Sequence, residues 1–192
     1  MRNVEVKICG ITRVCDAEFA AECGADYVGL VFVPSSKRFL PLGEAMKFAG
    51  LPVKKVGVFA DASLEEIRRI AKMVKLDVIQ LHGNETPEFA SRIDFAPVWK
   101  ACYDADFPAA RIVCDAPRGG SGQFGDHALA AILAKKRPVM LAGGITPENA
   151  AELIQKVRPA GIDLAGGVEC TPGIKDFRLI RKLFDNIRRI EK

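Results

Sequence analysis

Long apolar runs are absent from this sequence of 192 residues. No stretch approaches the ~18–20 consecutive apolar residues that a helix needs to cross a bilayer, so we expect no membrane partner. The first residues enter a strand pattern directly and lack the apolar segment of a signal peptide. The sequence therefore predicts a cytoplasmic protein.

Paired cysteine motifs are also missing, and histidine is scarce. The six cysteines include no CxxC pair, and only two histidines occur. Zinc sites and thiol–disulfide redox motifs depend on such spacings, and disulfides are rare in compartments that keep thiols reduced. The sequence thus predicts free thiols and no zinc site.

A strong excess of either charge is lacking. The net charge is +4, and residues 177–192, with six basic and two acidic residues, hold the whole excess. A basic terminal helix can indicate a nucleic-acid partner. We favour a solvated outer helix face and no nucleic-acid partner, because apolar residues recur there at helical spacing. The stripe expected to be buried comprises Phe177, Ile180, Phe184 and Ile187.

Eight short apolar runs rich in β-branched residues alternate with helical segments. Continuously apolar strands are typical of a parallel sheet covered on both faces, and the alternation indicates βα units. The pattern predicts an α/β protein in which residues 1–192 form a single (β/α)₈ TIM barrel; an open doubly wound sheet would share this pattern. The predicted strands are residues 4–9, 27–33, 55–59, 78–82, 98–102, 111–115, 139–142 and 161–165.

One βα unit is short. Only residues 103–110 separate the fifth and sixth runs, and Pro108 lies among them. A helix with two loops needs more chain, and proline interrupts a helix. We therefore expect helix five to be missing or replaced by a loop.

Capping residues predict where other helices begin. A serine or threonine before a helical stretch accepts a hydrogen bond from a free backbone N–H group, and a following proline or a glutamate three residues later strengthens the signal. The predicted N-cap residues are Ser63, Thr86 and Thr146, with Asp61 as a further capping group near Ser63.

Two glycine pairs follow the seventh and eighth predicted strands. Glycine allows backbone N–H groups to approach an anion closely, and TIM barrels often bind phosphate at these two positions. Either pair alone could be a tight turn. Together they predict a phosphate-binding site at Gly143, Gly144, Gly166 and Gly167.

Cys9 and Asp115 end the first and sixth predicted strands, where barrels place their chemistry. A cysteine there is by default a small buried hydrophobe and acts as a base only if a cation or helix dipole stabilises its thiolate. Lys7 faces the same side one layer lower, so its help cannot be assumed. A carboxylate at the end of a buried strand is costly unless paired or protonated. Asp115 is therefore a candidate acid, with a loop cap as the alternative.

Three more polar residues complete the candidate set. Arg38, in the loop after the second strand, offers a planar fork suited to a carboxylate or phosphate, although loop arginines are often simply solvated. His82 ends the fourth strand, as a substrate-binding or catalytic imidazole or as a structural residue. Asp163 lies in the eighth strand, next to the second glycine pair.

Several short motifs occur in order along nearly the whole chain. They are KICGIT at 7–12, GLVF at 29–32, SSKR at 35–38, VGVF at 56–59, QLHG at 80–83, LAGGI at 141–145, GVE at 167–169 and PGIKD at 172–176. In sequence and spacing this set resembles the phosphoribosylanthranilate isomerase family of tryptophan biosynthesis.

The resemblance implies a substrate, a reaction and roles for the candidate residues. The substrate would be N-(5′-phosphoribosyl)anthranilate, a small phosphorylated molecule, and the reaction an Amadori rearrangement by acid–base catalysis without metal or cofactor. Cys9 would be the general base and Asp115 the general acid. Arg38 would hold the anthranilate carboxylate, and Asp163 would orient the sugar hydroxyls.

Two departures from the family pattern accompany the resemblance. Ala165 and Gly166 stand where family members often have a small hydroxyl-bearing pair, so backbone N–H groups must carry more of the phosphate binding. Residues 119–126 are a residue shorter than the corresponding loop of the family, so a family role of this loop does not transfer directly to Phe124 or Asp126.

The nearest rival function is a phosphosugar isomerase of the kind found in histidine biosynthesis, in which aspartate would be expected in place of Cys9. A non-catalytic barrel with a nucleic-acid-binding tail is the other. Neither a monomer nor a homodimer is favoured by the sequence.

Overall fold

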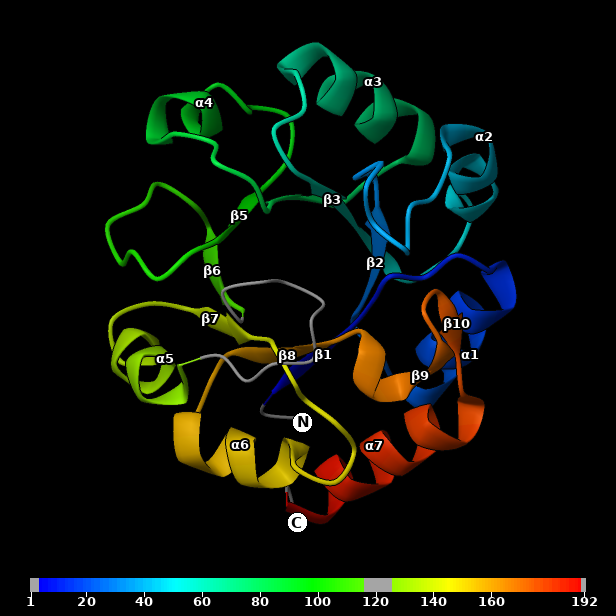
Figure 1. The fold of residues 1–192 in the computed structure, drawn as a ribbon, viewed down its shortest axis with the longest axis vertical. Coiled ribbons are helices and arrows are strands. Elements are labelled where there is room, and N and C mark those ends of the chain that lie inside the picture. The colour runs from blue at the N-terminus through cyan, green and yellow to red at the C-terminus, as the bar shows by residue number, and fades with distance from the viewer. Residues whose placement is uncertain (1–3, 116–125, 191–192) are drawn as a thin grey trace.

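The computed structural model describes residues 4–115 and 126–190. Its eight parallel strands close into a barrel, in which β8 pairs with β1 to complete the ring (Figure 1). The closed ring confirms the predicted TIM barrel and excludes the open doubly wound sheet. The strands are β1 (Glu5–Cys9), β2 (Tyr27–Val31), β3 (Lys54–Phe59), β4 (Val78–Leu81), β5 (Val98–Ala101), β6 (Arg111–Cys114), β7 (Val139–Leu141) and β8 (Gly161–Leu164).

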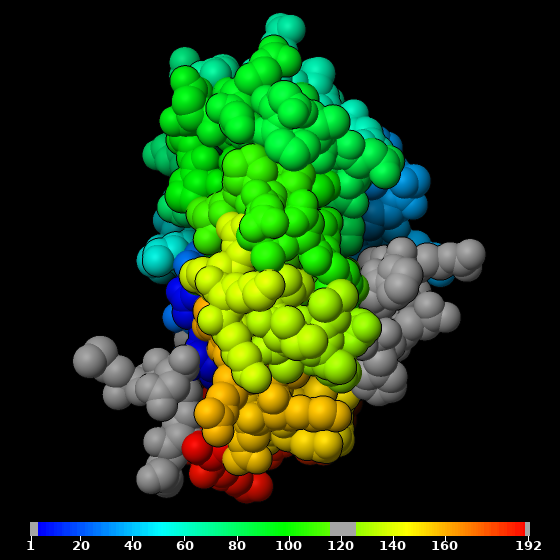
Figure 2. Space-filling view, turned by 90° about the vertical axis from the view of Figure 1, so that its left-hand side faces the viewer, coloured from blue at the N-terminus to red at the C-terminus, as the bar shows by residue number. Residues whose placement is uncertain are grey.

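Helices surround the ring of strands on its outside (Figure 1). In the side view, successive segments stack in chain order from green to red, as expected when neighbouring βα units lie side by side (Figure 2). None of the helices in the described ranges has the length and apolarity to span a bilayer. They are α1 (Val14–Cys23), α2 (Leu42–Ala45), η1 (Met46–Phe48), α3 (Leu64–Val74), α4 (Pro87–Ser91), α5 (His127–Ala134), α6 (Ala150–Val157), η2 (Gly166–Val168) and α7 (Phe177–Ile190), and a small hairpin of β9 (Glu169–Thr171) and β10 (Ile174–Lys175) precedes α7.

The connection between β5 and β6 lacks a helix, as predicted. Residues 102–110, all of them described, form turns and bends instead. The guanidinium of Arg137 donates to the backbone carbonyls of Ala105 and Phe107, each at 2.7 Å, and also to that of Ala109. One partly buried guanidinium thus satisfies carbonyl groups that a helix would otherwise satisfy internally.

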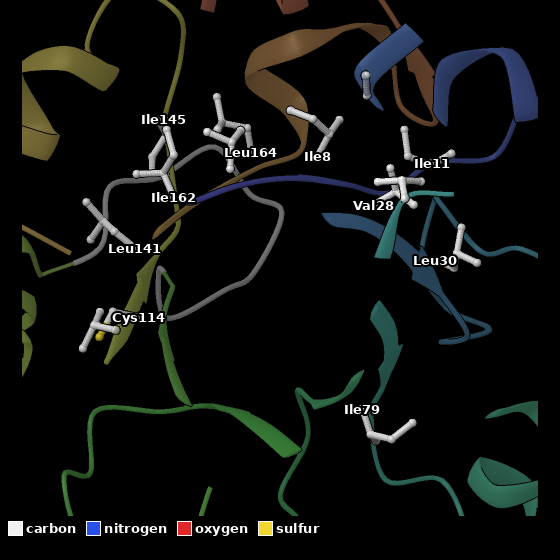
Figure 3. Packing of buried hydrophobic residues seen from close by; sticks show 14 of the residues in the cluster. Ile8, Ile11, Val28, Leu30, Ile79, Cys114, Leu141, Ile145, Ile162 and Leu164 are labelled. Carbon is white, nitrogen blue, oxygen red and sulfur yellow. The ribbon is translucent and has the colours of Figure 1, made fainter. Parts of the chain in front are cut away.

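Side chains alternate between the two sides of the barrel wall, because successive residues of a strand point in opposite directions. The outward-facing residues pack with the helices into one large apolar cluster. Figure 3 shows part of this cluster, with side chains that project from the strands away from the barrel interior. Those labelled on strands are Ile8, Val28, Leu30, Ile79, Cys114, Leu141, Ile162 and Leu164.

The inward-facing residues form an apolar layer, a polar layer and a second apolar layer along the strand direction. Near the amino ends of the strands, Tyr27 and Trp99 meet edge to face with ring centroids 4.9 Å apart. Beyond them lie the buried Lys7, Gln80 and Asp163. The layer nearest the carboxyl ends comprises Cys9, Val31 and Val58.

Two capping assignments are confirmed and one is wrong. The hydroxyls of Ser63 and Thr86 cap α3 and α4 as predicted. Thr146 does not cap α6, which begins only at Ala150. Its hydroxyl instead accepts the N–H of Glu148 at 3.3 Å, so this threonine closes a turn before the helix.

Asp61 and Phe177 also differ from expectation. The Asp61 carboxylate does not cap a helix but accepts the N–H of Asn84 at 2.7 Å, which ties the loop after β3 to the loop after β4. Phe177 is exposed rather than buried and stacks on Phe19 with centroids 4.1 Å apart. The buried stripe of α7 comprises Ile180, Leu183, Phe184 and Ile187.

Candidate active site

A cavity of about 1020 Å³ opens at the carboxyl ends of the strands. Its volume suits a ligand of drug or metabolite size. All of the residues proposed from the sequence line this one cavity, although they are spread over most of the chain. They are Cys9, Arg38, His82, Asp115, Gly143, Gly144, Asp163, Gly166 and Gly167.

The floor of the cavity is formed by Gln80 and Asp163, which are paired with a buried ammonium group. Lys7 is fully buried, and its Nζ donates to Oδ2 of Asp163 at 2.7 Å and to Oε1 of Gln80 at 2.9 Å. Burial lowers the pKa of Lys7, but the charges of Asp163 and Cys9 and the hydrogen bonds to them together more than offset this, so the pKa lies above its ordinary value. The other carboxylate oxygen of Asp163, Oδ1, is buried without a hydrogen bond to any described residue. A buried acceptor of this kind invites a ligand donor.

The thiol of Cys9 lies above this floor. Burial raises its pKa, while the ammonium groups of Lys7 and, more weakly, Lys175 act in the opposite direction. Lys175 also donates to the backbone carbonyl of Cys9 at 2.6 Å. In the free protein the thiol form is therefore favoured at neutral pH, and two nearby cations reduce the cost of forming the thiolate.

His82 and Asp115 meet at the cavity wall. Nε2 of His82 lies 3.5 Å from Oδ2 of Asp115. Burial lowers the pKa of His82 in spite of the opposing charge of Asp115, so the imidazole is neutral at neutral pH. His82 thus has the acid candidate as its neighbour, which the sequence alone did not indicate.

Arg38 is held in place rather than solvated. Its Nε and Nη2 donate to the two carboxylate oxygens of Glu169 at 2.9 and 2.7 Å, and Lys175 donates to the same carboxylate at 2.7 Å. Burial alone would raise the pKa of Glu169, but the hydrogen bond from Arg38 and the charge of Lys175 bring it below its ordinary value. Nη1 of Arg38 takes no part in the pair, which leaves this corner of the fork for a ligand anion.

The glycine loops after β7 and β8 touch each other. Gly143 and Gly144 adopt φ angles of 80° and 66°, a left-handed conformation that favours glycine. A Cβ atom on Gly167 would overlap the carbonyl oxygen of Ile145, so only glycine permits this approach. Asn149 braces the first loop, because its Nδ2 donates to the carbonyl of Gly144 at 3.0 Å.

The loop between β6 and α5 lies mostly outside the described residues, and Phe124 with it. Asp126, at its end, is described: its Oδ1 accepts the N–H of Leu129 at 2.9 Å and so caps α5. Asp126 thus has a local structural role at the start of α5.

Four residues of the site were not predicted from the sequence to be functional. They are Lys7, Gln80, Glu169 and Lys175. Three of them are long polar side chains that are almost fully buried, which is rare unless the groups are paired. Their partners lie on other strands, so local sequence patterns could not reveal the pairing. The local signals were the alternating position of Lys7 before Cys9 and the place of all four residues within the motifs KICGIT, QLHG, GVE and PGIKD.

No group of three or more His, Cys, Asp or Glu side chains in the described part of the chain is arranged to hold a metal ion. The charged groups of the site are instead paired with one another, as for Lys7 with Asp163 and Arg38 with Glu169. The arrangement can therefore offer proton donors and acceptors and positive charge to a ligand.

Known proteins match this chain over nearly its whole length. The sequence model of the family described as N-(5′-phosphoribosyl)anthranilate (PRA) isomerase matches residues 6–186. An N-(5′-phosphoribosyl)anthranilate isomerase from Chromohalobacter salexigens is 40% identical over 97% of this chain and 95% of its own. The crystal structure of phosphoribosyl anthranilate isomerase from Thermus thermophilus is 41% identical and superimposes with a TM-score of 0.92, covering 97% of this chain and 100% of the other.

A further solved structure carries a ligand. It is a phosphoribosyl anthranilate isomerase in complex with reduced 1-(o-carboxyphenylamino)-1-deoxyribulose 5-phosphate, 35% identical with a TM-score of 0.88, and the match covers 97% of this chain and 99% of that one. Family match, sequence identity and fold agree over nearly the whole length. This chain belongs to the N-(5′-phosphoribosyl)anthranilate isomerase family.

Proposed function

We propose that this protein converts N-(5′-phosphoribosyl)anthranilate into 1-(2-carboxyphenylamino)-1-deoxyribulose 5-phosphate, with Cys9 as general base and Asp115 as general acid. One observation carries the proposal. A single cavity contains a thiol flanked by two cations, a carboxyl group just after another strand, a fixed arginine and two glycine loops. Each of these matches one chemical feature of that substrate.

The substrate carries two anionic groups, and the cavity offers a place for each. The touching glycine loops after β7 and β8 suit the phosphate, because their backbone groups can approach an anion without interference from side chains. Arg38 suits the anthranilate carboxylate through the part of its fork that Glu169 does not use. The unpaired Oδ1 of Asp163 suits a ribose hydroxyl, which would donate to it.

The first chemical step opens the ribose ring. Asp115 donates a proton to the ring oxygen as the bond between this oxygen and C1′ breaks, and the lone pair of the anilino nitrogen forms a C1′=N bond. The product is a protonated Schiff base with a free hydroxyl on C4′. Its positive nitrogen makes the proton on C2′ acidic.

The second step forms an enolamine. The Cys9 thiolate removes the C2′ proton, the electrons of that bond form C1′=C2′, and those of the C1′=N bond return to nitrogen. The ammonium of Lys7 favours the thiolate before transfer. The enolamine then gains a proton at C1′ and loses the proton of its C2′ hydroxyl, which yields the aminoketose.

A direct assay tests the proposed function. Purified protein mixed with phosphoribosylanthranilate should abolish the anthranilate fluorescence in a catalytic manner, since the product has a different chromophore. The rate should scale with protein concentration and should remain after treatment with a chelator. Fluorescence that stays at the level of a protein-free control would overturn the proposal.

The phosphate site gives a second expected result. Gly167→Ala should raise KM by roughly 10-fold or more, because its Cβ atom would overlap backbone of the neighbouring loop and force the two glycine loops apart, which loosens their hold on a charged group. Steady-state kinetics give KM for this variant. Gly43→Ala is the control, since nothing lies within 4 Å of a Cβ atom at that helical glycine. Equal KM values for the two variants would contradict the assignment of the substrate phosphate to the glycine loops.

A further inference from the structure

A chain of polar side chains crosses the barrel from Lys7 to Asp115. Nζ of Lys7 lies 2.9 Å from Oε1 of Gln80, whose Nε2 lies 3.1 Å from Nδ1 of His82. Nε2 of the same imidazole lies 3.5 Å from Oδ2 of Asp115. The chain therefore connects the buried floor of the cavity with the carboxyl group to which the proposed function gives the first proton transfer.

The donors and acceptors along this chain can be assigned from its buried end. An ammonium group has only donors, so Lys7 must face the oxygen of Gln80 and not its NH₂ group. Asp163, whose carboxylate accepts from Lys7 at 2.7 Å, favours the charged form of Lys7 and with it this orientation of the Gln80 amide. The amide nitrogen of Gln80 then faces His82, and because it can only donate, Nδ1 of the imidazole must accept.

The tautomer of His82 follows from this assignment. A neutral imidazole carries one proton, and if Nδ1 accepts, the proton lies on Nε2. Burial and the charges of Lys7 and Lys100 lower the pKa of His82, while the carboxylates of Asp115 and Asp163 act in the opposite direction, and the balance favours the neutral ring. The N–H group of His82 is therefore directed toward Asp115.

We propose that Lys7 and Gln80 hold His82 in the Nε2–H tautomer, so that His82 is a positioning residue for the acid Asp115. An N–H donor at Oδ2 leaves the acidic proton on the other carboxyl oxygen, and it stabilises the carboxylate once that proton has gone to the substrate. The opposite tautomer would present a lone pair to Asp115 and take up the proton. The inference rests on the proposed role of Asp115.

The tautomer can be measured without substrate. In protein labelled with ¹⁵N-histidine, long-range ¹H–¹⁵N spectra at pH 7.5 should show His82 protonated at Nε2 and unprotonated at Nδ1. The protein has two histidines, so the spectrum of His127→Gln assigns the signals. A wild-type His82 that is protonated at Nδ1 would overturn the proposal.

Gln80→Glu replaces the amide group that donates to His82 by a carboxylate of almost the same shape. A carboxylate at this position accepts from Lys7 and also from the imidazole, so the proton of His82 should move to Nδ1. We expect kcat to fall by roughly 10-fold or more with KM changed by less than about 3-fold. Gln155→Glu, which makes the same change at an exposed position of α6, should leave both the tautomer and kcat unchanged.

Variants of His82 itself separate positioning from packing. His82→Gln keeps an N–H donor near the position of Nε2 and should retain at least about 10-fold more kcat than His82→Leu, which has none. Equal activity of these two folded variants, or an unchanged tautomer in Gln80→Glu, would overturn the proposal that Lys7 and Gln80 set the tautomer of His82 and that His82 positions Asp115. The proposed function fails separately, if wild-type protein does not act on phosphoribosylanthranilate, and that outcome leaves the spectra unaffected.

Discussion

Asp115→Asn should lower kcat by roughly 10³-fold, within the range that one positioned acid contributes. The amide keeps the shape of the carboxyl group and can still receive the N–H of His82, but it has no acidic proton for the ribose oxygen. Substrate binding should persist, because the glycine loops and Arg38 are unchanged. A fall in kcat with little change in KM is the signature of a group that acts in the transition state.

Two measurements make this expectation sharp. Calorimetry with reduced 1-(o-carboxyphenylamino)-1-deoxyribulose 5-phosphate should give similar affinities for the wild type and Asp115→Asn, which shows that the cavity is intact. Asp126→Asn makes the same chemical change at a helix cap and keeps the accepting oxygen, so its kcat should match the wild type. If Asp115→Asn retains near wild-type turnover, the acid lies elsewhere, and Asp163 is the next candidate.

Cys9→Ala should lower kcat by at least ~10²-fold, because alanine cannot remove the C2′ proton. The substitution is small and buried, and it leaves Lys7 paired with Asp163 and Gln80, so the floor of the cavity should persist. Steady-state kinetics with the fluorescence assay measure the loss. Circular dichroism and thermal unfolding establish that the variant is folded.

Cys114→Ala is the matched control for this variant. Both cysteines are buried, but Cys114 projects away from the barrel interior into the apolar cluster under the helices (Figure 3). Its loss leaves a cavity in the core and lowers stability, without removing a reactive group from the site. Similar kcat values for the two variants would make Cys9 a core residue and not a base.

The pH dependence of kcat/KM for the wild type should report the ionisation of the Cys9 thiol. Burial raises the pKa of Cys9 above that of an ordinary cysteine, so the thiolate fraction of the free protein grows as the pH rises through the neutral range. The limb of kcat/KM that depends on the base should therefore rise with pH, and it should be absent from Cys9→Ala. The donor Asp115 limits the profile from the alkaline side, because it must be protonated to act.

The strands and their ends could be predicted because their signals are local. Each apolar run is a strand within one or two residues of its predicted bounds, since burial on both faces of the barrel wall favours apolar side chains at most positions. The missing helix followed from the length of residues 103–110 in the same way. Where local signals compete, prediction failed, as at Thr146, whose hydroxyl satisfies Glu148 in a turn before the helix.

The residues of the site could likewise be predicted only where the signal is local. That Cys9, Asp115 and the glycine pairs line one cavity could be predicted, because strand ends can be located along the chain and a closed barrel gathers them at one mouth. The charged partners of Arg38 and Lys7 could not be predicted. Glu169 lies 131 residues from Arg38, and Asp163 lies 156 residues from Lys7, so no local pattern records either pair.

The sequence by itself determined the order of strands and helices, the family, and the residue types that reach the mouth of the barrel. Only the tertiary structure decided the electrostatics of the site: which cation faces the Cys9 thiol, which carboxylate holds Arg38, and which nitrogen of His82 faces Asp115. The reason is physical. Periodicity and capping act between residues a few positions apart, whereas charge and hydrogen bonding act between atoms a few ångströms apart, and only the closed barrel brings those atoms together.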